Sequence, residues 1–279
     1  MHIPHHDNHN RAIVDCNDEL TPLCYFNIVK LNKGESFTSQ VDGYETCIAP
    51  ATGSVDVKVG DSNFDAVGKR MHIWDGEPEG VYVPVGATAT MTCVSKNTEI
   101  FIAGAKFDEV YEPFVVRESD IDPVQYGSDD TKTHRKIKHI LGKSPAGKVG
   151  RLLVSELFTV GAGGWSGFPS HKHDTDSLPD ETRHDEVYNF RFNPENGFGA
   201  QFLTREGEDM GEVYHIRNSS TIQIDKGYHP CVAAPGYEMY YFTILGGLSQ
   251  RPLHQNFDPE HAYQLKTIPG IMDMVNKFK

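Results

Sequence analysis

The sequence has few cysteines, no long apolar run and no basic patch, and each absence excludes a class of protein. The five cysteines among 279 residues are scattered and form no C-x-x-C pair, so we expect neither a disulfide framework nor a cysteine zinc site. No apolar run is long enough to span a membrane, and no signal-peptide core stands near the start. A reducing cytoplasmic location is therefore the default expectation.

The balance of charge argues against nucleic-acid partners. The formal net charge is −13 at pH 7, and lysine and arginine are nowhere interleaved with aromatic residues in a patch. An anionic substrate would therefore need a local basic pocket.

Segments with helical periodicity are also few. Instead, 26 glycines and 16 prolines separate many short runs in which apolar and polar residues alternate, a pattern that favours an all-β protein. We expect short helices in two places only. One covers residues 126–142, beginning after Ser-Asp-Asp and closed by Gly142, and the other lies in the tail 248–279, which is suited to packing on a barrel or on a neighbouring subunit.

The expected helix at 126–142 carries the most basic stretch of this acidic chain, which consists of His134, Arg135, Lys136, Lys138 and His139. The simpler interpretation is a solvated face, or charges that complement the negative end of the helix dipole. The alternative is that this segment directs a positive group toward a carboxylate substrate.

The run from 163 to 229 contains the clearest chemical pattern. His171 and His173 are separated by one residue, so on an extended strand both imidazoles point to the same side. Glu186 opens a second strand-like run, and His229 follows a Lys-Gly turn. Three imidazole nitrogens and one carboxylate oxygen suit a divalent Zn, Mn, Fe or Ni ion and leave positions open for water or substrate. We therefore expect a catalytic rather than a structural metal site.

Several other residues near this pattern have competing interpretations. His184 lies two residues before Glu186, shares its face and could replace one of the ligands. Three acidic residues in the polar insertion that follows His173 could also reach a metal, although solvated loop residues are the simpler account; these are Asp174, Asp176 and Glu181.

Histidines elsewhere in the chain are not expected to form a specific site. His72 stands alone in the first half, which we interpret as a barrel without its own metal. A polar N-terminal segment would bind metal only adventitiously through His2, His5, His6 and His9.

A glycine, an H-x-H pair, a later glutamate and a distant histidine after a turn are similar to the two cupin motifs, so the chain resembles a bicupin. More narrowly, it resembles the 5-deoxy-glucuronate isomerase family of inositol catabolism, on the segments GGWSGFPSHKHDTDSLPDET, DEVYNFRF and KGYHPCVAAPGYEMYYFTILGG. The resemblance implies an N-terminal segment at 1–19, a metal-free cupin-like barrel with its connection at 20–148, and a metal-binding barrel with the tail at 149–279. It also implies a homo-oligomer and a metal held by His171, His173, Glu186 and His229.

The activity implied by this resemblance is the metal-dependent conversion of 5-deoxy-D-glucuronate to 5-dehydro-2-deoxy-D-gluconate. The metal would polarise the carbonyl and hydroxyl oxygens while a base moves the carbon-bound proton. The candidates for this base are Asp174, Asp176, Glu181 and Tyr241. The substrate carboxylate could be held by Lys172, Arg183 or Arg191, although Lys172 alternates away from the histidines and is expected to point outward.

Three other functions fit the same ligand set. The chain could isomerise another uronate, such as 5-keto-4-deoxyuronate, or bind a sugar acid without catalysis. Three histidines and a glutamate also suit an Fe(II)-dependent dioxygenase.

Overall fold

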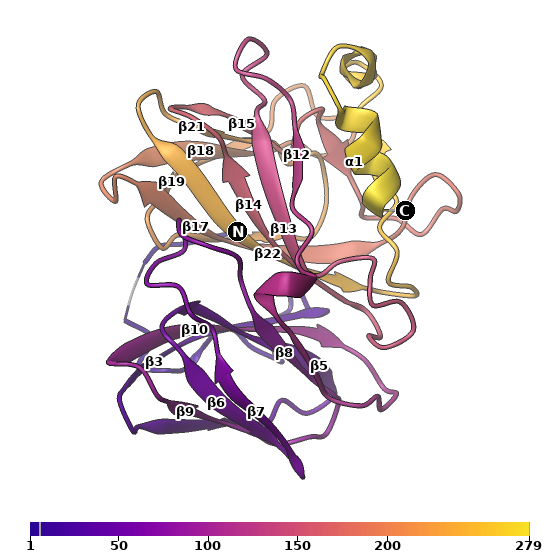
Figure 1. The fold of residues 1–279 in the computed structure, drawn as a ribbon. Helices are drawn as coiled ribbons and strands as arrows, with labels where there is room; N and C mark the ends of the chain where they lie inside the picture. Colours follow the sequence, from indigo (N-terminus) through magenta and orange to yellow (C-terminus); the bar gives the residue numbers. More distant parts are fainter. Residues whose placement is uncertain (6, 279) are drawn as a thin grey trace.

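The computed structural model describes residues 1–5 and 7–278; His6, one of the N-terminal histidines considered above, lies outside the described residues. Two β-barrels are stacked one on the other, the N-terminal one in indigo and purple and the C-terminal one in magenta to yellow (Figure 1). The protein is nearly all-β, as predicted. No helix in the described part of the chain is long and apolar enough to cross a membrane.

The N-terminal barrel consists of two antiparallel sheets. The larger sheet has the order β11 (Phe114–Val116), β8 (Gly80–Val83), β5 (Tyr44–Thr52), β10 (Asn97–Lys106), β3 (Cys24–Asn32) and β2 (Ala12–Val14). The smaller sheet has the order β4 (Ser36–Ser39), β9 (Ala89–Cys93), β6 (Val55–Val59) and β7 (Ser62–Val67). In β6 the sequence VDVKV places its three valines inward and its Asp and Lys toward solvent, the alternation expected of a half-buried strand.

The C-terminal barrel has three sheets. The largest has the order β1 (His2–Ile3), β20 (Thr221–Ile224), β17 (His184–Asn193), β22 (Glu238–Gly247), β14 (Leu152–Thr159), β13 (Arg135–Leu141) and β12 (Val124–Tyr126). A second sheet contains β15 (Gly164–Ser166), β21 (Cys231–Ala233), β18 (Phe198–Leu203) and β19 (Glu212–Arg217). The third pairs β16 (His171–Lys172) with β23 (Asn256–Phe257).

The two barrels meet through the outer faces of their larger sheets, which form one continuous apolar core. The rings of Phe101 and Phe242 lie 4.8 Å apart across this contact, and Phe26 stacks on Phe242 at 6.2 Å. A buried ion pair joins the barrels as well, since Arg70 Nη1 lies 2.8 Å from Glu156 Oε2. Strands such as β14 are therefore buried along their whole length, because both of their faces are covered.

The prediction of a helix at 126–142 is wrong, because residues 135–141 of this segment form β13 and Tyr126 is the last residue of β12. Strand β13 pairs antiparallel with β14 on one side and with β12 on the other, and these hydrogen bonds override the local helix signals. Both strands belong to the sheet of the C-terminal barrel, although we expected residues up to 148 to accompany the first barrel. We therefore propose that the boundary between the barrels lies within 117–123, after the first barrel's last strand.

The tail carries the helix expected there. The 3-10 helix η2 (Ala262–Lys266) is followed by α1 (Ile271–Phe278), and a further 3-10 turn, η1 (Glu118–Asp120), lies in the connection between the barrels. Ile271 and Met274 of α1 are buried in the core of the C-terminal barrel. The tail therefore packs on the barrel of its own chain (Figure 1).

Candidate metal centre

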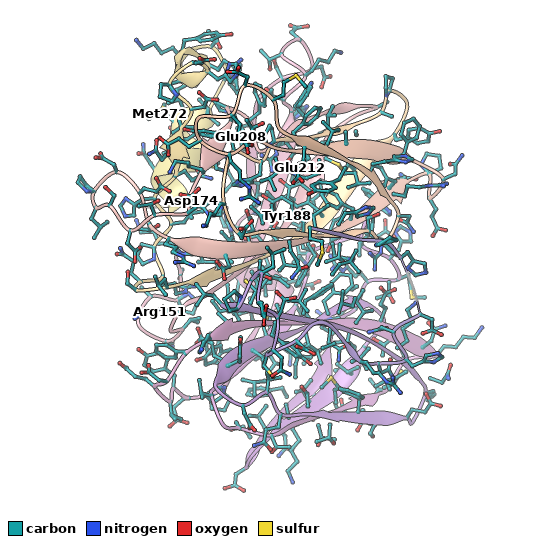
Figure 2. All side chains as sticks on the ribbon, turned by 180° about the vertical axis from the view of Figure 1, so that it is seen from behind. Arg151, Asp174, Tyr188, Glu208, Glu212 and Met272 are labelled. Atoms are coloured by element: carbon teal, nitrogen blue, oxygen red, sulfur yellow. The ribbon has the colours of Figure 1, made fainter. Side chains whose placement is uncertain are left out.

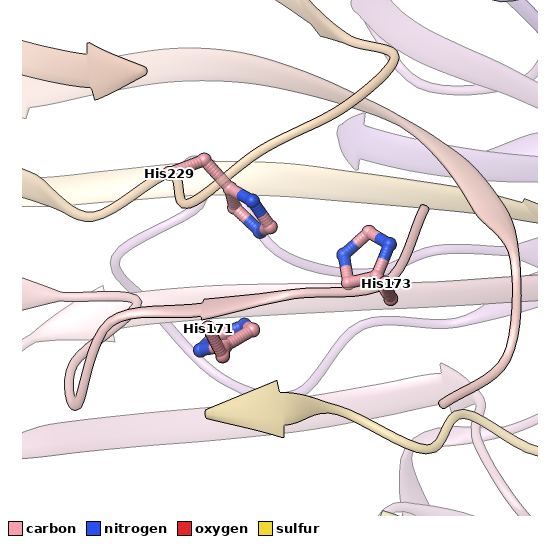
Figure 3. A group of neighbouring side chains, drawn as sticks. All are labelled: His171, His173 and His229. Carbon is pink, nitrogen blue, oxygen red and sulfur yellow. The ribbon is translucent and has the colours of Figure 1, made fainter. Parts of the chain in front are cut away.

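Three buried histidines converge inside the C-terminal barrel (Figure 3). His171 and His173 come from β16 and the residue that follows it, and His229 comes from the loop between β20 and β21. The ring of His229 lies 5.0 Å from that of His171 and 4.9 Å from that of His173. One nitrogen of each ring lies within 4.8 Å of the others, a spacing at which the three could share one metal ion. The pair separated by one residue thus faces the same side, as the strand alternation requires.

Backbone carbonyls orient all three imidazoles in the same way. The Nδ1 atom of His171 lies 3.0 Å from the carbonyl of Pro169, and that of His229 lies 2.8 Å from the carbonyl of Gly227. His173 Nδ1 faces the carbonyl of His184 at 3.2 Å. A carbonyl can only accept, so each Nδ1 carries the proton and each Nε2 presents a lone pair to the cluster. Such outer partners are typical of histidines that bind metals.

Glu186 supplies the carboxylate of the cluster. Its Oε2 lies 3.1 Å from His173 Nε2 and 3.2 Å from His229 Nε2, and the residue is buried on β17. Burial, reinforced by the neighbouring histidines, lowers the pKa of His171 to about 3.

These residues fit a divalent metal ion. Among the described residues, His229 Nε2 is buried without a hydrogen bond of acceptable geometry, although Glu186 is close. A buried lone pair without a proton donor is costly, and a cation would satisfy it. Neutral imidazole nitrogens with one carboxylate oxygen are the donors that such ions prefer. The structure therefore brings together the four residues for which we predicted metal binding.

His184, the rival ligand, is directed elsewhere. Its Nε2 lies 3.2 Å from the carbonyl of Arg251, and its Nδ1 faces the carbonyl of Thr182 at 3.3 Å. Its own carbonyl is the group that orients His173. His184 therefore supports the cluster from behind and does not join the three histidines.

A cavity adjoins the histidine cluster and is closed partly by the tail. Its lining includes His171, His173 and Glu186, with Leu253, Gln255, Phe257 and Met274 from the C-terminal segment. Gln255 Nε2 lies 2.9 Å from His171 Nε2, so the tail contacts a nitrogen that faces the cluster. A larger cavity of about 730 Å³ lies between the barrels, but its lining contains none of these histidines. We place the chemistry in the smaller cavity because the donor atoms converge there.

Of the four residues predicted as bases, only Tyr241 lines this cavity. Glu181 is buried in another network, where its Oε2 lies 2.9 Å from Lys172 Nζ and its Oε1 accepts from the backbone amide of Thr175 at 2.9 Å. Asp176 accepts from the amide of Arg183 and the hydroxyl of Ser249, near the surface. The loop acids therefore organise the loop and do not face the histidines.

Asp174 has a specific position beside the cluster. Its Oδ2 accepts a 2.8 Å hydrogen bond from the amide of Gly227, the residue whose carbonyl orients His229. Asp174 thus ties the loop after β16 to the turn that carries the third histidine (Figure 2 labels Asp174, with Tyr188 inside the same barrel). The structure indicates a positioning role that the spacing of the sequence alone could not reveal.

The three predicted carboxylate-binding cations also lie outside the cavity. Lys172 does lie on the opposite side of its strand from the histidines, but the prediction that it points outward is wrong, because its ammonium is buried between Glu181 and Asp174. The half-exposed Arg183 lies 4.0 Å from Asp185. Arg191 pairs with Glu99 at 2.6 Å beside the cavity between the barrels.

Arg135 is the cation that lines the cavity, together with Tyr126 and Tyr188. The sequence identifies Arg135 only as one member of a basic stretch, for which a positive group directed toward a carboxylate substrate is one of two interpretations. Successive residues of a strand point to opposite faces. Arg135 therefore faces the cavity, as Ile137 does, while Lys136 between them faces away.

Comparisons with known proteins identify relatives along nearly the whole chain. A sequence model of the KduI/IolB family matches residues 2–264. The 5-deoxy-glucuronate isomerase of Listeria monocytogenes is 27% identical over 257 residues, which cover 91% of this chain and 92% of that protein. The enzyme of the same name from Geobacillus thermodenitrificans is 29% identical over 244 residues, covering 87% and 86% of the two chains.

Solved structures agree with the fold. The crystal structure of an IolB-like protein from Salmonella typhimurium superposes with a TM-score of 0.84 at 28% identity, covering 91% of this chain and 94% of that one. A variant of Bacillus subtilis oxalate decarboxylase has a TM-score of 0.66 at 11% identity, covering 100% of this chain and 86% of that one. The second likeness concerns the fold alone, and with the two stacked barrels it confirms the predicted bicupin.

Proposed function

The chain belongs to the KduI/IolB family and is an isomerase, and we propose that it converts 5-deoxy-D-glucuronate to 5-dehydro-2-deoxy-D-gluconate with a divalent metal ion, as a step of inositol catabolism. The observation that carries this proposal is the convergence of three Nε2 atoms and one buried carboxylate beside a cavity. The relatives called 5-deoxy-glucuronate isomerase support the choice of substrate.

The metal would be held by His171, His173, Glu186 and His229. When bound, it would supply Lewis-acid polarisation of the substrate's carbonyl and adjacent hydroxyl oxygens. The chain's own contribution is preorganisation, because the three Nδ1–H donors are fixed by backbone carbonyls before any ligand arrives.

The walls of the cavity are largely apolar. Leu157, Leu245, Phe257 and Met274 line it together with the histidines. An aldose–ketose isomerisation moves one proton between adjacent carbons and a second proton between the oxygens on those carbons, and exclusion of water would prevent loss of the reactive enediolate between these transfers.

Within this cavity we assign the proton transfer to Glu186. Burial raises the pKa of Tyr241, so its phenol keeps its proton at neutral pH and can donate a hydrogen bond but not act as the base. Glu186 is the one carboxylate among the described residues of the lining, so it is the available base. Its Oε2 faces the imidazoles, which leaves Oε1 to take the carbon-bound proton and return it to the neighbouring carbon.

Proton NMR of 5-deoxy-glucuronate in deuterated water tests the proposal, with metal-loaded wild type beside a His171→Ala/His173→Ala variant. The expected result is ketose signals with the wild type alone. A folded, metal-loaded wild type that leaves this sugar unchanged would refute the proposed substrate. 5-Keto-4-deoxyuronate, run in parallel, then tests the alternative uronate.

A further inference from the structure

Arg135 is a buried cation without an acidic partner. Its residue is 3% exposed, and no carboxylate of the described chain forms an ion pair with it. Its Nη1 donates to the phenol oxygen of Tyr126 at 2.8 Å, and its Nη2 donates to that of Tyr241 at 2.7 Å. Its Nε is buried with no hydrogen-bond partner among the described residues.

The other deeply buried cations of the described chain are compensated. Arg70 pairs with Glu156, and Lys172 pairs with Glu181. Arg251 has no carboxylate, but its guanidinium donates to three backbone carbonyls. A guanidinium stays charged even when buried, and an unpaired buried charge costs several kcal/mol. Arg135, in contrast, has neither a carboxylate partner nor a set of backbone carbonyls around its guanidinium among the described residues.

The missing anion would lie in the cavity of the metal centre. Arg135 lines that cavity with His171, His173 and Glu186, while the next residue of its strand faces the other way. The phenol of Tyr241, which accepts a hydrogen bond from Arg135, belongs to a ring that lies 4.5 Å from the ring of Tyr188, another residue of the lining. The cation and the histidine cluster thus line the same cavity.

The two phenols hold the guanidinium in one orientation. Tyr126 comes from β12 and Tyr241 from β22, the strands on either side of β13 and β14. Ser166 Oγ lies 2.5 Å from the Tyr241 oxygen and fixes that phenol in turn. A guanidinium fixed on two sides presents its remaining N–H groups in a set direction, as bidentate recognition of a carboxylate requires.

We propose that Arg135, oriented by Tyr126 and Tyr241, binds the carboxylate of the sugar acid and so places the opposite, carbonyl end of the substrate at the histidine cluster. This inference rests on the proposed function for the identity of the sugar. The chemistry of the anchor requires only a chain with a carboxylate at one end and a carbonyl at the other. Specificity for acids over neutral sugars follows, because a neutral sugar would leave the guanidinium uncompensated.

The test compares wild type with Arg135→Gln and Arg135→Lys. The matched control is Lys136→Gln, which removes a cation from the outward face of the same strand. Turnover of 5-deoxy-glucuronate is compared with that of 5-deoxy-glucose, the analogue with a hydroxymethyl group in place of the carboxylate. Metal content and thermal unfolding are recorded for every variant, so that a folding defect is recognised.

We expect Arg135→Gln to lose about 100-fold or more in kcat/KM for the acid, mainly through KM, with metal content unchanged. Its rate with the neutral sugar should match that of wild type, which a merely structural defect would not allow. Arg135→Lys should recover part of the loss, and Lys136→Gln should behave as wild type. An equal loss of kcat/KM for the acid and for the neutral sugar, or no loss for the acid, would refute the proposal that Arg135 binds the carboxylate.

A binding measurement separates this inference from the proposed reaction. Calorimetric titration with D-glucuronate should show binding to wild type and Lys136→Gln but not to Arg135→Gln, whether or not any sugar is turned over. That result together with no turnover of 5-deoxy-glucuronate would reject the proposed substrate and keep the anchor. Equal binding to wild type and Arg135→Gln, or no binding to wild type, would reject the anchor itself.

Discussion

The substitution Glu181→Gln tests whether Glu181 is the catalytic base or a structural residue of its loop, and the structure predicts the structural role. Glu181 is 2% exposed and its two oxygens accept from Lys172, from the amides of Asp174 and Thr175, and from Asn256. A glutamine keeps one acceptor oxygen, but its NH2 group would face the N–H groups that donate to the second carboxylate oxygen of Glu181. Lys172 would then depend on Asp174 at 3.0 Å and on the exposed Glu206 at 3.7 Å.

The expected loss of stability follows from these contacts. Removing one partner of a buried ion pair costs about 3–5 kcal/mol. Because Lys172 keeps its second carboxylate, we expect the lower end, about 3 kcal/mol. For a chain of this size that is a fall of roughly 6–12 °C in Tm, at about 2–4 °C per kcal/mol.

Calorimetric unfolding and turnover at 25 °C measure the two effects separately, with Asp180→Asn as the control from the same loop, where the side chain is exposed. Glu181→Gln should unfold at lower temperature while the folded enzyme keeps turning over substrate, because Glu181 does not line the cavity. An unchanged Tm combined with abolished turnover would refute this reasoning and identify Glu181 as the base.

Three further substitutions test separate parts of the account. His184→Ala should keep its bound metal, because that ring faces backbone carbonyls; loss of all metal on inductively coupled plasma mass spectrometry would make His184 a ligand. Asp174→Asn should weaken metal affinity about 10-fold through the Gly227 turn, measured by competition with a chelator, and an unchanged affinity would exclude this positioning role. Arg70→Met should destabilise the protein by about 3–5 kcal/mol in urea unfolding, since it leaves Glu156 buried without its partner, and a wild-type midpoint would contradict that.

The sequence predicted the parts that depend on local periodicity. Alternation along a strand is enough to place His171 and His173 on one side, and the structure has them there. The same rule correctly placed Lys172 on the opposite side of the strand from the histidines, but the expectation that this side is exposed was wrong. Its burial depends on Glu181, nine residues away, and no local pattern encodes that loop closure.

The helix expected at 126–142 shows where local signals fail. Its capping and charge pattern are real, but β13 gains a neighbouring strand on each side, and those partners lie outside the local window. Once the segment is a strand, period two directs Arg135 inward and Lys136 outward. The cation beside the metal centre could therefore not be identified while the segment was interpreted as a helix.

The central claim is that the buried cluster of three histidines and Glu186 holds the metal on which isomerisation depends. The most direct measurement strips the protein with a chelator, restores metal in steps, and follows conversion of 5-deoxy-glucuronate by proton NMR against bound metal. The account predicts a rate that is negligible without metal, rises in proportion to it and saturates at about one equivalent per chain. Conversion at an undiminished rate by metal-free protein would contradict it.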